Sequence, residues 1–305
     1  MVDISVILDP IIIGLASGTI YGVMALGFVL IYRVGKLVNI AVGDMVLMGA
    51  YLVMAFGELR LIGNPVGNLI FALILASLLY MVFAIATERG LMRPLYGQSI
   101  LSLIMMTVAL GLFLRGITIL LWGTTLRVFP EQHVVFPPIP ITIGPIHLPY
   151  VYVWSISGSI IIFGFFFYMF RKTLFGFAMR AVSLEPEAAA AHGISIKKIY
   201  TYSWMIAYVA AALAGLVLGA INGINIIISD LGLSRALPAA IIGGIDSPGG
   251  ALLGGLLLGL LEQTLGTYMN MFIPGIREVI PFIVLLAILV VKPYGLFGTV
   301  RIERV

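Results

Sequence analysis

The chain has 305 residues, of which 61% are hydrophobic and 10% charged, and its mean hydropathy is +1.16. Soluble domains are about 45–50% apolar and about 25% charged, so this composition excludes a soluble globular protein and predicts an all-α, polytopic membrane protein. The net charge of +4 is small and the basic residues collect in a few loops, which indicates membrane orientation rather than nucleic-acid binding. The absence of cysteine excludes disulfides, thiolate metal sites and thiol catalysis.

Eight apolar runs are the expected long spans, since about 30 Å of hydrocarbon requires about 20 residues per crossing. Their ends carry Gly, Pro or charged residues, as helix ends do. No basic stretch precedes the first run, so no cleaved signal peptide is expected. Residues 1–305 should form a single transmembrane domain, with spans at residues 10–32, 38–57, 67–87, 100–121, 150–170, 199–220, 250–272 and 278–292.

Three polar residues fall inside the early spans, where ionisable side chains are costly and usually functional. Asn39 and Asp44 lie near the start of the second span, where either capping of a broken helix or a part in a gate fits their chemistry. Arg115 lies toward the C-terminal end of the fourth span, so its guanidinium either reaches the interface or lines a pathway. All three are candidate pathway residues.

Residues 122–149 carry six prolines. Proline fixes φ and removes a hydrogen-bond donor, so we expect an ordered, non-helical cap with a small hairpin at residues 143–147. A platform for a binding protein and a purely structural lid fit this composition equally well.

Residues 171–198 form the one sizeable stretch that is both charged and helix-competent. We expect a short solvent-facing helix in it, because a proline suits the first turn and two glutamates favour the positive N-terminus. The alanine run that follows forms helix readily, and a glycine can adopt the left-handed stop. The residues concerned are Glu185, Pro186, Glu187, Ala188, Ala189, His192 and Gly193.

The spacing of Glu187-Ala188-Ala189 and Gly193 resembles the EAA-x3-G loop with which permease subunits of bacterial ATP-driven importers dock on their ATPase partners. An ordinary alanine-rich loop fits the spacing as well, and the Ile-x-Leu-Pro extension of the motif is absent. The resemblance implies that residues 171–198 are a cytoplasmic ATPase-coupling loop, with the coupling helix at residues 184–194.

Placing this loop in the cytoplasm satisfies the positive-inside rule for every strongly basic loop that precedes it. The N-terminus and residues 122–149 then lie outside, so the cap is extracytoplasmic. The basic C-terminus also favours the cytoplasm, which requires one crossing more than eight. The basic residues that support this orientation are Arg33, Lys36, Arg89, Arg93, Arg171, Lys172, Arg180, Lys197, Lys198, Lys292, Arg301 and Arg304.

Residues 231–247 are the candidate for the extra crossing. Pro238, Gly243 and Gly244 predict that this crossing is short or broken. Irregular backbone at membrane depth is tolerated where it faces protein or a water-filled cavity, so this segment should face protein or line such a cavity.

Glu262 and Gln263 lie midway along the span at residues 250–272. A carboxyl group at this depth should face the interior of the helix bundle, where it is paired or protonated. Two roles fit this pair of residues: they line a pathway, or they form structural hydrogen bonds.

Several separate blocks carry a resemblance that covers nearly the whole chain. They are GLASGTIYGVMALGFVLIYRVGKLVNIAVGDMVLMGAYL (residues 14–52), the coupling loop, ALPAAIIGGIDSPGGALLGGLLLGLLEQ (236–263) and KPYGLFG (292–298). Together they resemble the LivH-type permease of branched-chain amino acid ABC importers. Val42 stands where many relatives have histidine, so no role of that histidine carries over.

The resemblance implies a multi-pass subunit of the prokaryotic inner (plasma) membrane, surrounded by lipid and without a cofactor. Its implied partners are a second, LivM-like permease, two cytoplasmic ATPase subunits and an extracytoplasmic substrate-binding protein. The implied cargo is a branched-chain or other neutral amino acid, or a related small polar solute.

Chemistry on the chain itself is not expected. A G-x-x-x-x-G-K-[S/T] loop is absent, so ATP hydrolysis must come from separate subunits. The three histidines have neither metal-ligand spacing nor a nucleophile partner, which argues against an enzyme. The alternative is a self-sufficient channel or a proton-coupled secondary transporter, in which Asp44 and Glu262 would be the coupling groups.

Overall fold

The computed structural model describes residues 4–130, 132–137, 140–143 and 146–298. The N-terminal half begins with α1 (Ile4–Gly35), α2 (Val42–Glu58) and α3 (Pro65–Ala86). A π-helical turn, η1 (Thr87–Met92), and a 3₁₀ turn, η2 (Arg93–Leu95), lead to α4 (Ile100–Trp122). The cap then carries α5 (Gln132–Val135) and two antiparallel strands, β1 (Ile141–Ile143) and β2 (Ile146–Leu148), with Ile141 opposite Leu148.

The regular elements in the described part of the second half are all helices. It begins with α6 (Tyr150–Lys172), α7 (Leu174–Leu184), α8 (Pro186–Ala191) and α9 (Ile196–Asn222). It continues with α10 (Ile227–Leu231), a π-helical turn η3 (Gly232–Ala236) and α11 (Leu237–Gly243). It ends with α12 (Pro248–Met269) and α13 (Ile276–Val291).

Six of the described helical stretches are long and apolar enough to cross a membrane: residues 8–35, 65–95, 100–122, 150–172, 196–222 and 248–269. The expected count of eight long spans is therefore not supported. Helix α2 has 17 residues and α13 has 16, fewer than the about 20 that a straight crossing needs. The chain leaves α1 at Lys36, where φ is +52°, and runs non-helically to residue 41, which shortens α2. Helix α13 starts only after Gly275, where φ is +83°.

The cap differs from the expectation in one respect. It contains the single helical turn α5, although a non-helical segment was expected. All six prolines lie outside this turn, so its backbone keeps every N–H donor. The hairpin has its strands at residues 141–143 and 146–148, and its connecting residues lie outside the described part of the chain.

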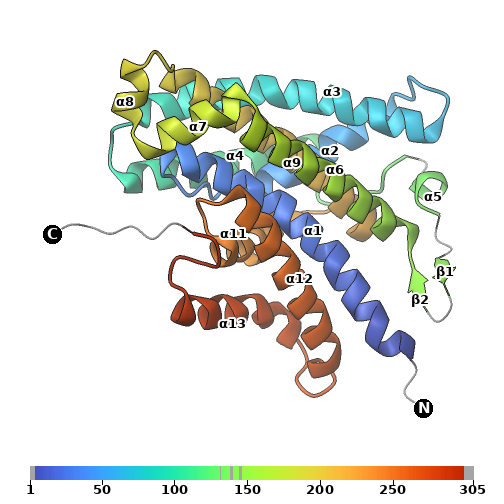
Figure 1. Ribbon diagram of the computed structural model, residues 1–305. Coiled ribbons are helices and arrows are strands. Elements are labelled where there is room, and N and C mark those ends of the chain that lie inside the picture. The colour runs from blue at the N-terminus through green and yellow to red at the C-terminus, as the bar shows by residue number, and fades with distance from the viewer. Residues whose placement is uncertain (1–3, 131, 138–139, 144–145, 299–305) are drawn as a thin grey trace.

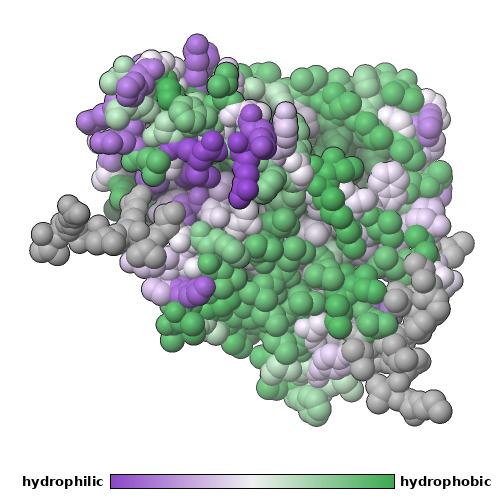
Figure 2. Space-filling model, in the orientation of Figure 1, coloured by the Kyte–Doolittle hydropathy of each residue, from purple (hydrophilic) through white to green (hydrophobic). Residues whose placement is uncertain are grey.

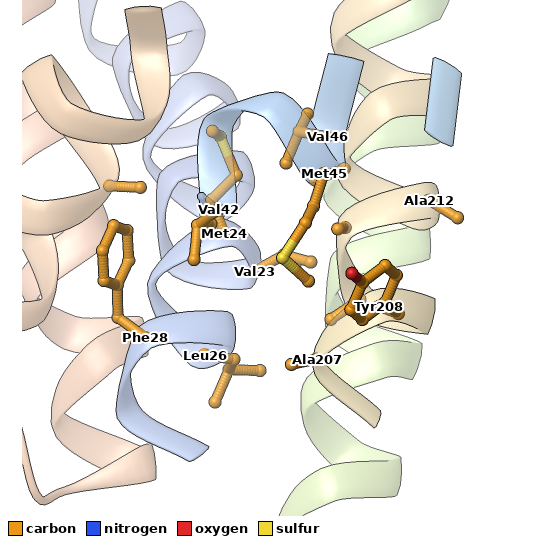
Figure 3. Packing of buried hydrophobic residues seen from close by; sticks show 14 of the residues in the cluster. Val23, Met24, Leu26, Phe28, Val42, Met45, Val46, Ala207, Tyr208 and Ala212 are labelled. Atoms are coloured by element: carbon orange, nitrogen blue, oxygen red, sulfur yellow. The ribbon is translucent and has the colours of Figure 1, made fainter. Parts of the chain in front are cut away.

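The core lies where α1, α2 and α9 meet. Lipid gives helices no hydrophobic reason to associate, so van der Waals packing between closely fitting side chains must hold them. Helices α3, α4 and α6 instead turn rows of large apolar side chains outward, as lipid-facing or partner-facing helices do. Figure 3 shows the buried packing, with side chains from α1 (Val23, Met24, Leu26, Phe28), α2 (Val42, Met45, Val46) and α9 (Ala207, Tyr208, Ala212).

Glycines bring α1 and α12 into backbone contact. A Cβ atom on Gly18 would lie 2.7 Å from the carbonyl oxygen of Gly255, and one on Gly14 would lie 2.9 Å from that of Gly259. No residue with a side chain fits at such distances without moving the backbone. This four-residue spacing of small residues therefore sets how closely the first and last parts of the bundle approach.

Helix α8 and the cap lie at opposite ends of the molecule. Figure 1 shows α8 at one end and α5 with the β1–β2 hairpin at the other. Hydrophilic residues gather over α7 and α8, whereas hydrophobic residues cover α12 and α13 (Figure 2). This distribution is that of a protein whose middle lies in a bilayer.

Candidate functional site

A first group of charges, the central cluster, consists of Asp44, Arg115 and Asp230. The Nε of Arg115 donates to Oδ1 of Asp44 at 2.7 Å, and its Nη2 donates to Oδ1 of Asp230 at 3.3 Å. Arg115 thus joins α4 to α2 and α10 by direct ion pairs. The side chain of Asp44 is 12% exposed, that of Arg115 33% and that of Asp230 64%, so the cluster reaches the surface of this chain.

The backbone before α2 explains why Asp44 lies deep enough to meet Arg115. Asn39 is fully buried, and its Oδ1 accepts a hydrogen bond from the N–H of Ala41 at 3.1 Å. The N–H of Ile40 donates to Oγ1 of Thr107 on α4 at 3.2 Å. Asn39 is therefore a turn residue. Asp44 lies in the first turn of α2, where a negative charge is favoured, and its side chain pairs with arginine instead of capping the helix.

A second group of charges lies on the side of the molecule that carries the N-terminal half of α1. Here Arg235 of η3 is 6% exposed and Glu262 of α12 is 2% exposed. The Nε and Nη2 of Arg235 donate to Oε1 of Glu262 at 3.2 and 3.1 Å. Nη2 also donates to Oε2 of Glu278 at 2.6 Å. Arg277 completes the group, with its Nε 3.8 Å from Oε1 of Glu262.

These four residues line a cavity of about 400 Å³, the outer cavity, together with residues of α1, α9 and α10. Its two arginines and two glutamates balance in charge. One oxygen of Glu262, Oε2, is buried without a hydrogen-bond partner among the described residues. Tyr21 lies close enough to Glu262 to interact with it electrostatically. The outer cavity therefore combines guanidinium donors with a buried carboxylate oxygen that has no hydrogen-bond partner among the described residues.

Of the other pathway candidates, Gln263 contacts the second group of charges, since its Oε1 accepts a hydrogen bond from Nη2 of Arg277. The structure separates the remaining candidates of the segment 231–247 from these charges. Gly243 instead packs its backbone against that of Gly250 on α12, and Pro238 lies buried in the first turn of α11. Gly244, with φ +104°, contacts the backbone of Gly298. These three residues of the segment 231–247 let helices and the C-terminal motif pack closely, and none of them lines the outer cavity.

Sequence reasoning missed Arg235, Arg277 and Glu278, which complete the outer group. Arg235 carried a usable signal, because an ionisable residue in a segment expected at membrane depth needs a partner. Arg277 and Glu278 lie at the start of α13, where charge is ordinary, so only the fold shows that Arg277 reaches Glu262 and that Glu278 reaches Arg235.

The remaining candidates form the polar end of the molecule. Helix α8 covers residues 186–191 and is shorter than the expected 184–194, because Leu184 ends α7 and Glu185 is extended, with φ −149°. Glu187, Ala188 and His192 are exposed, and Ala189 faces inward at 5% exposure. At Gly193 φ is +80°, and the N–H of Ile194 donates back to the carbonyl of Ala189 at 3.0 Å.

These features define a polytopic α-helical membrane protein, and charge clusters held within its bundle are typical of membrane transport proteins. Residues 11–289 match the family of branched-chain amino acid transport system permease components, and the chain belongs to this family. It is a transport subunit and not an enzyme.

Relatives cover nearly the whole chain. It is 26% identical to the high-affinity branched-chain amino acid transport system permease protein LivH of Escherichia coli, over 96% of each chain. It is 28% identical to the corresponding permease protein BraD of Pseudomonas aeruginosa, over 98% of each. It is also 26% identical to the nucleoside ABC transporter permease protein NupC of Lactococcus lactis, over 80% of this chain and 78% of that one.

The central cluster predicts strong coupling between Asp44 and Arg115. Arg115→Gln leaves the mostly buried carboxylate of Asp44 without its main partner and should destabilise the protein, because an unpaired buried charge is costly. Adding Asp44→Asn should recover part of the loss, with a coupling free energy of about 1–2 kcal/mol. Thermal unfolding in lipid nanodiscs measures both. The exposed Arg89→Gln is the control, and additive effects of Asp44→Asn and Arg115→Gln would contradict the coupling.

Proposed function

We propose that the chain is the permease subunit of an ATP-driven importer in a prokaryotic inner (plasma) membrane. It would work with a second, LivM-like permease, two cytoplasmic ATPase subunits and an extracytoplasmic substrate-binding protein. The observation that carries the proposal is the exposed helix α8, held between α7 and α9 at the polar end of the molecule. The family and the transport systems named for its relatives support it.

Helix α8 has the properties of a docking element. Its outward residues are short or acidic, and the adjacent Leu184 is 86% exposed, which offers an apolar anchor beside the charge. The left-handed Gly193 turns the chain directly into α9, a stretch of membrane-spanning length. A displacement of α8 is therefore transmitted to the helix bundle through a short, hydrogen-bonded turn. Coupling of an ATPase movement to the bundle requires such a connection.

The central cluster supports a second permease beside this chain. Arg115 and Asp230 keep 33% and 64% of their side-chain surface exposed, although Arg115 lies inside the span formed by α4. A charge at this depth is costly against lipid, so protein or water must cover it. We place the partner permease and the translocation path against this face of α4 and α10.

The same proposal includes nine crossings with the N-terminus outside. In this topology, α2 and α13 are each extended by flanking non-helical residues to cross the membrane. Residues 227–243 cross it as α10, η3 and α11. Because the chain has no cysteine, single cysteines at Asn222 and Asp246 report on this last crossing. An impermeant thiol reagent should label them from opposite faces of the membrane. Labelling of both from one face would remove the crossing.

The coupling role of α8 predicts a specific effect of Gly193→Val. Valine is strained at φ +80°, so the exit from α8 should change and ATP hydrolysis should lose its link to uptake while the protein stays inserted. Gly275→Val is the matched control, since Gly275 has φ +83° and, as at Gly193, an added Cβ atom would meet no other atom within 4 Å. The measurement is uptake and ATPase activity in proteoliposomes that contain the full complex.

Wild-type coupling in Gly193→Val, or equal uncoupling in Gly275→Val, would contradict the assignment of α8. Uptake that continues without the ATPase subunits would favour the channel or secondary-transporter alternative.

The outer cavity supports a zwitterionic cargo, such as a branched-chain or other neutral amino acid. Its balanced charge matches a solute with one ammonium and one carboxylate group. The carboxylate of Glu262, which lines the cavity, can accept from the ammonium, and Arg277, whose side chain is 47% exposed, can donate to the carboxylate of the solute. A nucleoside lacks this pair of charges, so the cavity favours an amino acid over the cargo named for NupC.

Glu262→Gln should therefore weaken uptake of neutral amino acids. Loss of a charge-assisted hydrogen bond to this carboxylate raises the KM of uptake by about tenfold or more. The ATPase activity of the assembled complex should persist, because α8 is untouched. The exposed Glu58→Gln on the same side is the control, and an unchanged KM in Glu262→Gln would exclude the outer cavity from the path.

A further inference from the structure

A second large cavity lies at the opposite end of the spans, among α1, α6, α7 and the start of α12. It measures about 610 Å³ and we call it the inner basic cavity. Four cationic side chains line it: Arg33 from the last turn of α1, Arg171 and Lys172 from the end of α6, and Arg180 from α7. None of these residues belongs to the central cluster or to the outer cavity.

The four cations lack an anionic partner of matching strength. Among the described residues none of them forms an ion pair with a carboxylate. Arg180 acts on Arg33 as a like charge, and Asp246 acts on it as an opposite charge. Arg180 donates through Nη1 to the carbonyl of Phe170, and Arg171 lies 4.7 Å from the ring centre of Phe167. The cavity thus holds a concentrated positive charge that an anion would neutralise.

The wall of the cavity on the side toward the middle of the membrane span is aromatic. Phe163, Phe166, Phe167 and Phe170 follow the spacing i, i+3, i+4 and i+7, so they form one face of α6 that runs from the basic end toward the middle of the span. The rings of Phe166 and Phe170 stack at 6.1 Å. Phe167 remains 58% exposed, so this face is open to a long apolar ligand.

The start of α12 adds donors and a favourable dipole at the same level. Gly249 lines the cavity in the first turn of this 22-residue helix, and a Cβ atom added there would meet no other atom within 4 Å. The positive end of the helix dipole favours a negative group there. Cations, helix dipole and apolar wall therefore occur in the order in which a phospholipid presents its phosphate and its acyl chains.

We propose that the inner basic cavity binds one anionic phospholipid of the cytoplasmic leaflet, with its phosphate among Arg33, Arg171, Lys172 and Arg180. One of the acyl chains of this lipid lies along the phenylalanine face of α6. Basic pockets between membrane helices on the cytoplasmic side are suited to such headgroups. A bound lipid would contact α1, α7 and α12 together, and α7 leads directly into α8. This inference rests on the proposed orientation of the chain in the membrane and is independent of which cargo is transported.

The test compares lipids on the purified, delipidated chain. Phosphatidylglycerol and phosphatidylcholine are added in detergent, and binding is counted by native mass spectrometry while thermal unfolding is followed in parallel. We expect phosphatidylglycerol to bind at least about tenfold more tightly and to raise the unfolding temperature further. Inorganic phosphate forms a third arm, and protection by phosphate equal to that by phosphatidylglycerol would assign the cavity to a free anion and overturn the lipid proposal.

Paired variants separate this site from general surface charge. Arg171→Gln with Lys172→Gln removes two exposed cations of the cavity, so the protein should fold and lose at least about tenfold in affinity for phosphatidylglycerol. Lys197→Gln with Lys198→Gln removes the same charge at the start of α9, outside the cavity, and should bind as the wild type does. Equal loss in both pairs, or equal binding of the two lipids, would overturn the proposal.

Discussion

An ionised side chain at the centre of a bilayer costs roughly 3 kcal/mol or more, so every helix that carries one needs a partner on another helix. Two groups of charges meet this constraint here, and a third lies near the end of a span. Asp44 of α2 pairs with Arg115 of α4, and Glu262 of α12 pairs with Arg235 of η3. At the end of α3, the fully buried Glu88 receives two hydrogen bonds from Arg93 and one from Thr201 of α9. These contacts join helices that are far apart in the sequence.

The glycine contacts make the pairings possible. Arg235 reaches Glu262 because η3 and α11 lie against α12, and that approach needs Gly254 beneath Ala239 and Gly243. On the other side of the bundle, Gly43 of α2 lies against Ser229 and Gly232, which brings Asp230 within reach of Arg115. Close backbone packing and charge pairing therefore depend on each other, since a bulkier residue at either glycine would separate the ion-paired groups.

The charged groups differ in composition along the length of the molecule, and the proposed roles follow these differences. The outer cavity combines both signs of charge, which suits a small polar solute. The inner basic cavity carries only positive charge beside an apolar wall, which suits an amphiphile. Helix α8 carries exposed acidic and small residues beyond that cavity, which suits a protein surface. Each chemistry thus appears where the corresponding solvent, lipid or partner would meet the chain.

The sequence by itself determined the class of the protein, because composition and the length of apolar runs reflect the bilayer directly, without knowledge of contacts. It also located α8 and its Gly193 stop, since proline, alanine and glycine act through local backbone preferences. It identified Glu262 and Asp44 as costly residues, but not their partners. Only the tertiary structure decided that Arg115 neutralises Asp44, that Arg235 and Arg277 meet Glu262, and that α2 starts late after a buried non-helical stretch. Such pairings depend on how helices distant in the chain are positioned, and helical periodicity alone carries no record of that arrangement.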